Sequence, residues 1–342
     1  MNIDVDVTND FPMKQATGSM RLALAPMEGV IDAPMRQLLT NMGGYDRCVT
    51  EFVRVTDVLL PERVFFRLCP ELEGDGCTAS GVPVYTQLLG SNAQALAVNA
   101  QRAVALGAPG IDLNFGCPAK TVNNSMGGSI LLRDPHQVGS IVKVVRDAVD
   151  DNVPVTAKIR LGYENHDALP EIVGLIREAG ATELAIHART KFDGYKPPAW
   201  WSAVRCVMHE GIDNTYINGE IWSVDDALQA RTQSGCAHIM LGRSALAAPD
   251  LGQRIRAHEL GVTLELMPWL DVSRLVEGQF LRSDCHSPRH VGNRIKQWLA
   301  YLKRTYPEVP DLFNRLRTLH DVPSIVAAFA EHREIVLAQG AG

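Results

Sequence analysis

The sequence predicts a (β/α)8 TIM barrel followed by an all-helical C-terminal domain, and three observations carry this prediction. Eight short β-like runs recur at intervals of roughly 25 to 45 residues, with helical patterns between them. After about Ala247 the strand signal stops, and apolar residues continue at helical spacing to the C-terminus. An open doubly wound sheet remains the second possibility, because it uses the same alternation of strand and helix.

The eight runs are apolar on both faces, which is typical of parallel strands covered by helices. Asp134 before Pro135 and the segment 223–226 give helix start signals, the second one resembling a capping box. Ser91 precedes an Ala-rich run and is expected to cap another helix. In chain order the predicted strands are Leu22–Ala25, Cys48–Phe52, Pro83–Leu88, Ile111–Asn114, Val155–Ile159, Leu184–His187, Thr215–Asn218 and His238–Leu241.

The same patterns divide the chain into three predicted parts. Residues 1–19 form an N-terminal extension, residues 20–261 form the catalytic barrel, and residues 262–342 form the helical domain. Prolines mark the joints between the helices of the last part. Its predicted helical segments are Pro268–Leu281, His290–Tyr306, Asp311–His320 and Pro323–Ala338.

Composition excludes several classes of protein. Of the 342 residues, 46% are hydrophobic and 21% are charged, which suits a globular core and excludes a disordered or coiled-coil chain. No apolar run approaches the roughly 20 residues of a membrane span. The first twenty residues carry three acids and the single Lys14, so a secretory signal is not expected. The seven cysteines are odd in number and scattered without close pairing, which argues against a disulfide framework. We expect a cytoplasmic protein with reduced thiols.

The charge is distributed unevenly along the chain. The net charge of -6 argues against a protein that coats nucleic acid indiscriminately. Between Arg282 and His320, however, eight Lys or Arg residues stand against three acids. This basic stripe on an acidic body is a candidate docking face for a polyanion.

Polar residues follow the predicted strands with unusual regularity. The C-terminal ends of barrel strands face the active site, so these side chains are expected to share one pocket. Taken alone, a Lys or His at a strand end is more often a salt-bridge or capping residue. A functional site is indicated only by the whole set of strand-end residues together. The strand ends supply Ala25-Pro26-Met27, Glu51, Gln87, Asn114 with Cys117, Lys158 with Arg160, His187, Asn218-Gly219-Glu220 and Gly242-Arg243.

The chemistry of these residues favours a phosphorylated redox ring, FMN, over a metal. Gly219 and Gly242 allow backbone N–H groups to approach a phosphate, and Arg243 adds a suitable charge. The Gln87 side chain offers a donor and an acceptor together, which matches the amide-like edge of such a ring. Lys158 supplies a cation that could stabilise the ring in its anionic reduced form. The sequence has no HExxH, no paired CxxC, no GxGxxG after the first strand and no Walker loop, so no metal, tightly held dinucleotide or ATP is expected.

These motifs resemble those of the tRNA-dihydrouridine synthases, flavoenzymes that reduce specific uridines in tRNA. The resemblance covers nearly everything after about Met20, and the tail Arg294–Leu302 is most similar to the C-type bacterial branch, which is associated with uridine 16. Three positions depart from the usual family pattern, and the changes are small and lie at backbone-lining positions. They are Ser129, Ala188 and Ile217. The motifs are Ala25-Pro-Met-Glu-Gly29, Thr50-Glu-Phe52, Gln87-Leu-Leu-Gly90, Asp112-Leu-Asn-Phe-Gly-Cys-Pro118, Gly127-Gly128, Lys158-Ile-Arg160, His187-Ala-Arg-Thr190, Asn218-Gly-Glu220 and Gly242-Arg243.

The resemblance implies a mechanism in which NADPH, with NADH as a possible substitute, reduces FMN. Hydride then passes to C6 of a flipped-out uracil, and Cys117 donates a proton to C5. A thiol with a pKa of about 8.5 keeps its proton at pH 7 and can still release it. The residues implied for FMN binding are Ala25, Pro26, Met27, Gln87, Lys158, His187, Asn218, Gly219, Glu220, Gly242 and Arg243.

The resemblance also implies tRNA as the partner, and we expect a monomer that binds neither membrane nor metal. Asn114 and Arg160 are expected near the uridine, whereas the other tRNA candidates form a group of spaced cations with one stacking ring. Each of these cations taken singly also fits a solvated helix face. The full set of tRNA candidates is Arg54, Asn114, Arg160, Arg294, Lys296, Tyr301 and Arg317.

Two other functions remain open from the sequence. A small-molecule flavin barrel of the dihydroorotate or dihydropyrimidine dehydrogenase type would use the same phosphate site, but it has no need of a basic helical tail. A non-catalytic RNA-binding barrel is disfavoured because Cys117, Lys158 and His187 are all intact.

Overall fold

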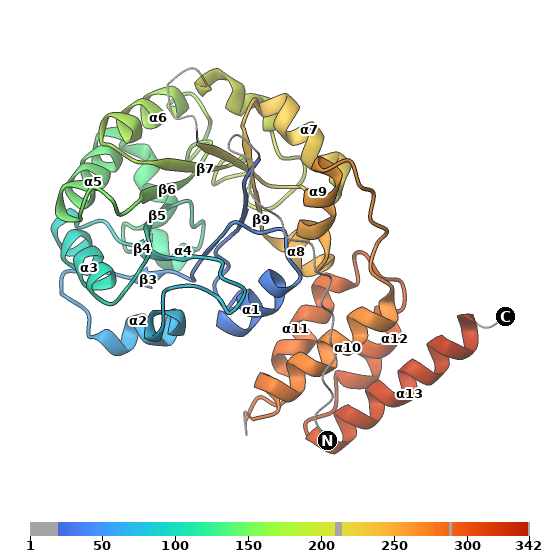
Figure 1. Cartoon of the computed structure of the whole chain (residues 1–342). Helices are drawn as coiled ribbons and strands as arrows, with labels where there is room; N and C mark the ends of the chain where they lie inside the picture. Colours follow the sequence, from blue (N-terminus) through green and yellow to red (C-terminus); the bar gives the residue numbers. More distant parts are fainter. Residues whose placement is uncertain (1–19, 209–213, 287–288, 341–342) are drawn as a thin grey trace.

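The computed structural model describes residues 20–208, 214–286 and 289–340, so the predicted N-terminal extension lies outside the described residues. Parallel strands form a closed barrel in the order β2-β1-β9-β8-β7-β6-β5-β4-β3, and the pairing of β2 with β4 closes the ring (Figure 1). The (β/α)8 barrel is therefore confirmed. The strands are β1 (Leu22–Leu24), β2 (Arg47–Val49), β3 (Val53–Arg54), β4 (Val84–Leu89), β5 (Ile111–Phe115), β6 (Val155–Arg160), β7 (Glu183–His187), β8 (Thr215–Asn218) and β9 (His238–Leu241).

The predicted strand Cys48–Phe52 is divided into β2 and β3. Val49 pairs with Tyr85 and Val53 pairs with Leu88, so three residues on one side oppose two on the other. This is a β-bulge. Its cause is Thr50, whose side-chain Oγ1 accepts a hydrogen bond of 3.0 Å from the Gln87 N–H. A hydroxyl thereby replaces a backbone acceptor in the ladder, and the chain bends toward the site.

Helices cover the outside of the barrel (Figure 1). The capping predictions at Asp134 and Ser223 are confirmed, and Asp226 completes the capping box. The prediction for Ser91 is wrong by one residue, because the Asn92 side chain accepts the cap hydrogen bond from the Ala95 N–H. The helices are α1 (Ala33–Asn41), α2 (Glu62–Leu68), α3 (Ala93–Ala105), α4 (Lys120–Asn123), α5 (Pro135–Ala148), α6 (Leu169–Glu178), α7 (Val224–Ser234), α8 (Arg243–Ala247) and α9 (Leu251–Glu259).

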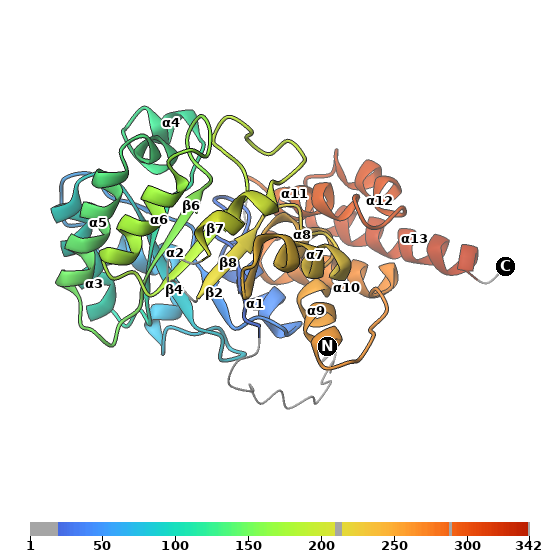
Figure 2. The ribbon, with the colours of Figure 1, turned by 90° about the horizontal axis from the view of Figure 1, so that it is seen from above.

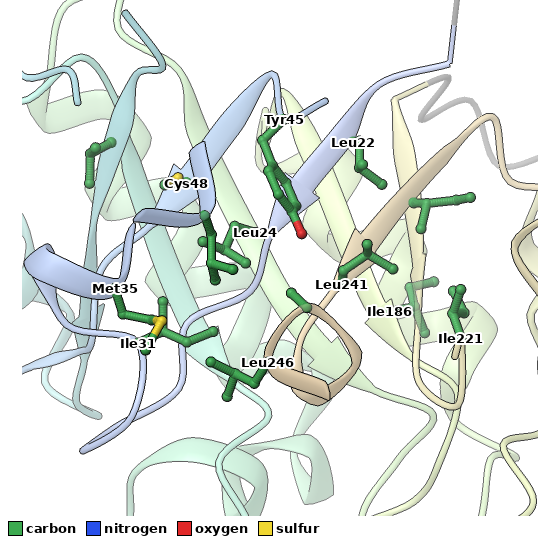
Figure 3. Packing of buried hydrophobic residues seen from close by; sticks show 14 of the residues in the cluster. Leu22, Leu24, Ile31, Met35, Tyr45, Cys48, Ile186, Ile221, Leu241 and Leu246 are labelled. Atoms are coloured by element: carbon green, nitrogen blue, oxygen red, sulfur yellow. The ribbon is translucent and has the colours of Figure 1, made fainter. Parts of the chain in front are cut away.

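The main core lies between the strands and these helices. Figure 3 shows Leu24, Leu241 and Leu246 gathered with Ile31 and Met35, in the space between the barrel wall and helices α1 and α8. All five side chains are buried. Burial of such apolar surface stabilises the wall that carries the strand ends.

The N-terminal end of the barrel interior is filled by a buried charge. The Arg47 guanidinium lies 4.8 Å from the ring centroids of both Tyr85 and Tyr216, and it is ion-paired with Glu183. Burial of a charge is tolerated only when it is paired in this way. A paired charge and two rings therefore occupy the interior at this end.

A helical region follows α9. Trp298 donates a hydrogen bond of 3.0 Å to the Leu246 carbonyl, and Arg294 pairs with Asp32 at 2.9 Å, so α11 is fastened to the barrel. The helical region lies beside the barrel in Figures 1 and 2. The predicted boundary at 262 falls between α9 and α10 and stays a prediction. The helices are α10 (Trp269–Gln279), α11 (Asn293–Leu302), α12 (Val309–Leu316) and α13 (Val322–Gly340), with a π-turn at Phe280–Asp284.

No helix within residues 20–208, 214–286 and 289–340 combines the length and the apolar character needed to cross a membrane.

Candidate active site

A cavity of about 680 Å³ opens at the C-terminal ends of the strands. Cys117 and all the residues predicted to bind the cofactor line it, together with Asn114, Arg160 and Tyr301 from the predicted tRNA set. The structure thus brings together residues that lie more than 200 positions apart in the sequence, as the barrel topology requires. The cofactor group lining it is Ala25, Pro26, Met27, Gln87, Lys158, His187, Asn218, Gly219, Glu220, Gly242 and Arg243.

Asn114 positions the loop that carries Cys117. Its Oδ1 accepts hydrogen bonds of 2.9 Å from the N–H groups of both Gly116 and Cys117. Its Nδ2 donates to Gln87 Oε1 at 2.8 Å, and Gln87 Nε2 donates to Asp112 Oδ2 at 2.7 Å. Gln87 is fully buried, so this chain of side-chain amides fixes the orientation of Asn114. Asn114 lines the cavity, and its Nδ2 also keeps one unused donor hydrogen.

The carbonyl of Cys117 is held as firmly as its N–H. It accepts hydrogen bonds from Asn123 Nδ2 at 2.9 Å, the Ser129 N–H at 3.0 Å and Ser129 Oγ at 2.8 Å. Ser129, one of the departures from the usual family pattern, therefore adds a bond to this loop. Burial raises the pKa of the Cys117 thiol above its ordinary value. The thiol is consequently protonated at neutral pH.

Lys158 places an ammonium group in the cavity. Its Nζ lies 3.2 Å from Asn218 Oδ1, and Asn218 Nδ2 donates to the Met240 carbonyl at 2.8 Å. Burial, followed by the charge of Arg160, lowers the pKa of Lys158 to about 8. At pH 7 the group is still charged in most molecules, but it loses its proton in mildly alkaline solution.

Arg160 braces the loop after β7. Its Nε donates to the Gly116 carbonyl at 2.8 Å, and its Nη1 donates to the carbonyls of Thr190 and Gly194, both at 2.9 Å. These bonds fix the loop that brings Tyr195 to the cavity wall, with the Arg160 guanidinium 5.3 Å from the Tyr195 ring centroid. Burial lowers the pKa of Arg160 from its usual value.

A buried charge network surrounds His187. Arg189 Nη1 lies 3.2 Å from His187 Nε2, while Arg189 and Arg243 pair with Glu220 at 2.7 and 2.9 Å. Burial, together with Arg160, Lys158 and the other nearby cations, lowers the pKa of His187 well below its ordinary value. His187 is therefore neutral at pH 7. Because arginine can only donate, Nε2 is the acceptor and Nδ1 carries the proton.

Three aromatic and basic residues at this site were not predicted from the sequence. Tyr195 and Trp222 line the cavity, and the Arg243 guanidinium lies 5.1 and 5.3 Å from their ring centroids. Arg304, which follows α11, lies 3.8 Å from the Trp222 ring centroid. Tyr195 and Trp222 lie in loops beyond the strand ends and Arg304 lies beyond a helix, so no strand register indicates them. Only the closeness of Trp222 to Asn218-Gly219-Glu220 gave a signal.

The remaining predicted tRNA residues do not line the cavity. Arg54 donates to the Thr121 carbonyl at 3.1 Å, and Lys296 donates to the Leu319 carbonyl at 2.6 Å. Arg294 donates to the Gly29 carbonyl at 2.6 Å and pairs with Asp32, whereas Arg317 is exposed at the end of α12. Three of these four cations therefore also hold parts of the protein together.

Residues 23–310 match the family model described as Dihydrouridine synthase (Dus). The chain belongs to the dihydrouridine synthase family. Two relatives are each 48% identical to it: a tRNA-dihydrouridine(16) synthase of Pseudomonas putida, over 90% of this chain and 95% of the relative, and one of Shewanella oneidensis, over 90% and 96%. The dihydrouridine synthases are flavin-dependent oxidoreductases that act on tRNA, so the match accounts for the redox and RNA features together.

Two solved structures share the barrel fold with this dihydrouridine synthase. Histamine dehydrogenase from Rhizobium sp. 4-9 matches with a TM-score of 0.54 and 15% identity, over 76% of this chain and 48% of that one. A 2-naphthoyl-CoA reductase matches with a TM-score of 0.54 and 14% identity, over 71% and 50%. The chain thus spans about half the length of these two structures, and the likeness supports the fold alone.

Proposed function

We propose that this dihydrouridine synthase reduces the C5=C6 bond of uridine 16 in the D-loop of tRNA, with FMN as the bound cofactor and NADPH as the reductant. The position is supported by relatives that carry this specificity in their names and match over at least 95% of their own length. The observation that carries the chemistry is Cys117, whose protonated thiol lies in the same cavity as the predicted FMN residues. NADH is the alternative reductant.

The donor set fits a phosphorylated flavin. Lys158 and Arg243 provide two cations at the wall of the cavity. Gly219 lies so close to His187 that a Cβ atom on it would approach the imidazole to 2.8 Å, so glycine is required at this point of the cavity wall. Backbone N–H groups after the last two barrel strands are the usual phosphate site of this fold. We assign the phosphate to Gly219, Gly242 and Arg243 and the ring to Gln87 and Lys158.

When bound and reduced, FMN supplies the hydride that C6 of the uracil accepts. Cys117 supplies the matching proton to C5, and the hydride and proton together saturate the double bond. The raised pKa of Cys117 keeps that proton in place until the substrate arrives. The Lys158 ammonium stabilises negative charge on the reduced ring. Because His187 is neutral, it would donate a hydrogen bond from Nδ1 to FMN without adding charge.

The uridine must leave its stack to reach this cavity, since the thiol lies inside the mouth of the barrel. Asn114 and Arg160 lie beside Cys117 and would contact the extruded base. We assign tRNA docking to Arg54, Arg294, Lys296, Tyr301 and Arg317. Tyr301 is the member that lines the cavity, so it connects the helical region with the reacting base. The protein would act as a monomer in the cytoplasm, where its tRNA substrate is found.

The test uses the full-length protein with FMN, NADPH and an unmodified tRNA transcript. Dihydrouridine is expected at position 16, and a transcript with cytidine at that position is expected to stay unmodified. Product at another uridine would overturn the assigned position, and absence of product from any transcript with flavin fully bound would overturn the proposed reaction.

A further inference from the structure

A group of rings and cations lies outside the cavity, with two of its members exposed and two half-buried. We name it the Phe192 platform, and it consists of Arg133, Tyr163, Lys191 and Phe192. The rings of Tyr163 and Phe192 meet edge to face, with centroids 5.7 Å apart. Lys191 Nζ lies 4.9 Å from both centroids, and the Arg133 guanidinium lies 4.2 Å from that of Tyr163. Phe192 is 65% exposed, which is unusual for so large an apolar side chain.

Backbone hydrogen bonds join the two segments that carry the platform. The N–H of Lys191 donates to the Gly162 carbonyl at 3.0 Å, and the N–H of Phe192 donates to the Tyr163 carbonyl at 3.3 Å. A Cβ atom on Gly162 would meet the Asn165 carbonyl oxygen at 2.0 Å, so this close approach requires glycine. The two backbone segments that carry the rings are therefore held side by side.

The same segment forms part of the cavity wall. Arg160, which lines the cavity, donates to the Gly194 carbonyl, and Tyr195 follows in the same loop. Asp193 Oδ2 accepts a hydrogen bond of 2.7 Å from the Thr190 N–H, which closes the turn from Thr190 to Asp193. Figure 2 shows α4 and the yellow-green loop after β7 standing on the same side of the barrel. The platform therefore adjoins, along the chain, residues that line the cavity.

The charge of the platform complements a polyanion. Among the residues that the structure describes, no acidic side chain lies within ion-pair distance of Lys191. Arg133 is paired with Glu164, and both of these side chains are exposed. An exposed aromatic face beside an unpaired cation, as Phe192 and Lys191 provide, suits single-stranded nucleic acid, since a base stacks on the ring and a phosphate meets the charge.

We propose that the Phe192 platform is a second RNA-contact surface, on which an unpaired nucleobase of the tRNA stacks against Phe192 while Lys191 binds a neighbouring phosphate. The inference rests on the proposed function, because tRNA is the RNA concerned. It places a contact on the barrel rim, apart from the basic stripe of the helical region, so that the tRNA is held from two sides of the cavity.

The experiment measures tRNA affinity at several salt concentrations for Phe192→Ser, Phe192→Leu, Phe192→Trp and Lys191→Gln. Loss of one stacked base weakens binding by about 5-fold to 100-fold, so this loss is expected for serine and leucine, whereas tryptophan retains the affinity. Lys191→Gln is expected to reduce the slope of log affinity against log salt by about 0.7 to 0.9. Leu260→Ser, at an exposed apolar residue after α9, and Lys143→Gln on α5 are the matched controls.

Flavin content and NADPH oxidation without tRNA are expected to be unchanged in all these variants, which separates the platform from the reaction centre. Phe192→Ser and Phe192→Leu with wild-type affinity, beside a wild-type protein that binds tRNA normally, would overturn the platform and leave the proposed function intact. A wild-type protein that fails to bind tRNA at all would overturn the proposed function, and the platform with it.

Discussion

A Cβ atom on Gly128 would lie 2.8 Å from the carbonyl oxygen of Cys117. Gly128 also has a φ of +68°, in the left-handed region that glycine adopts without strain. The close approach brings Ser129 within hydrogen-bonding distance of the same carbonyl. The backbone at Gly128 therefore determines where the Cys117 loop lies, and with it the thiol.

Replacement of Gly128 by alanine is expected to lower the free energy of unfolding by about 1 to 3 kcal/mol, because the new methyl group meets a backbone atom at an unfavourable φ. Dihydrouridine formation should fall more than flavin content, since the thiol is displaced. Urea unfolding and product analysis check this. The control is Gly174→Ala in α6, where the structure shows open space around the added atom and a gain of about 0.5 to 1 kcal/mol is expected. Equal effects of the two changes would contradict the argument.

Asn114→Ala is expected to destabilise the protein by about 1 to 3 kcal/mol. The reason is that the N–H groups of Gly116 and Cys117 and the side-chain Oε1 of Gln87 all lose a partner. The rate of dihydrouridine formation should fall while flavin remains bound. Denaturant titration and flavin absorbance measure the two effects. Asn165→Ala provides the control, since Asn165 is exposed and accepts a similar hydrogen bond from the Asp167 N–H. If both variants behave alike, Asn114 does not position the loop.

Cys117→Ala is expected to keep bound flavin and NADPH oxidation but to slow dihydrouridine formation by about 100-fold to 10,000-fold, the range for loss of a general acid. Cys206→Ala changes an exposed thiol outside the cavity and should leave all three measurements as in the wild type. Product yield from Cys117→Ala equal to that of the wild type would refute the proton-donor assignment.

The rate of uridine reduction should fall as the pH rises through about 8. Burial lowers the pKa of Lys158 to about 8, so deprotonation there removes the charge that stabilises the reduced ring. The pKa of Cys117 is raised, so the thiol still holds its proton over this interval. Lys158→Arg, which keeps its charge in alkaline solution, is expected to move the fall to higher pH. A pH profile that Lys158→Arg leaves in place would assign the titration to another group.

Much of the site was predictable because barrel topology converts chain position into spatial position. Once the strands were located, Gln87, Lys158, His187 and Asn218 had to face one cavity, and all of them line it. The bulge at Thr50 was hidden, because it depends on a side-chain hydroxyl that replaces a backbone acceptor across the sheet.

Residues whose role depends on loop conformation were also beyond the sequence. Arg160 holds the carbonyls of the loop that carries Tyr195, and this contact joins two different strand ends. Similarly, Lys296 looked like a free cation, but its ammonium donates to the Leu319 carbonyl. Pattern and spacing report which face a residue occupies, whereas such partners arise only from the folded chain.

The most direct test of the central claim follows the bound flavin in the absence of oxygen. The protein is reduced with NADPH, the excess reductant is removed, and unmodified tRNA is added while the flavin absorbance is recorded. The cavity described above predicts that the oxidised spectrum returns and that dihydrouridine appears in an amount equal to the flavin, while Cys117→Ala yields far less product. A flavin that stays reduced in the presence of tRNA, or a purified protein that takes up no flavin, would contradict the account.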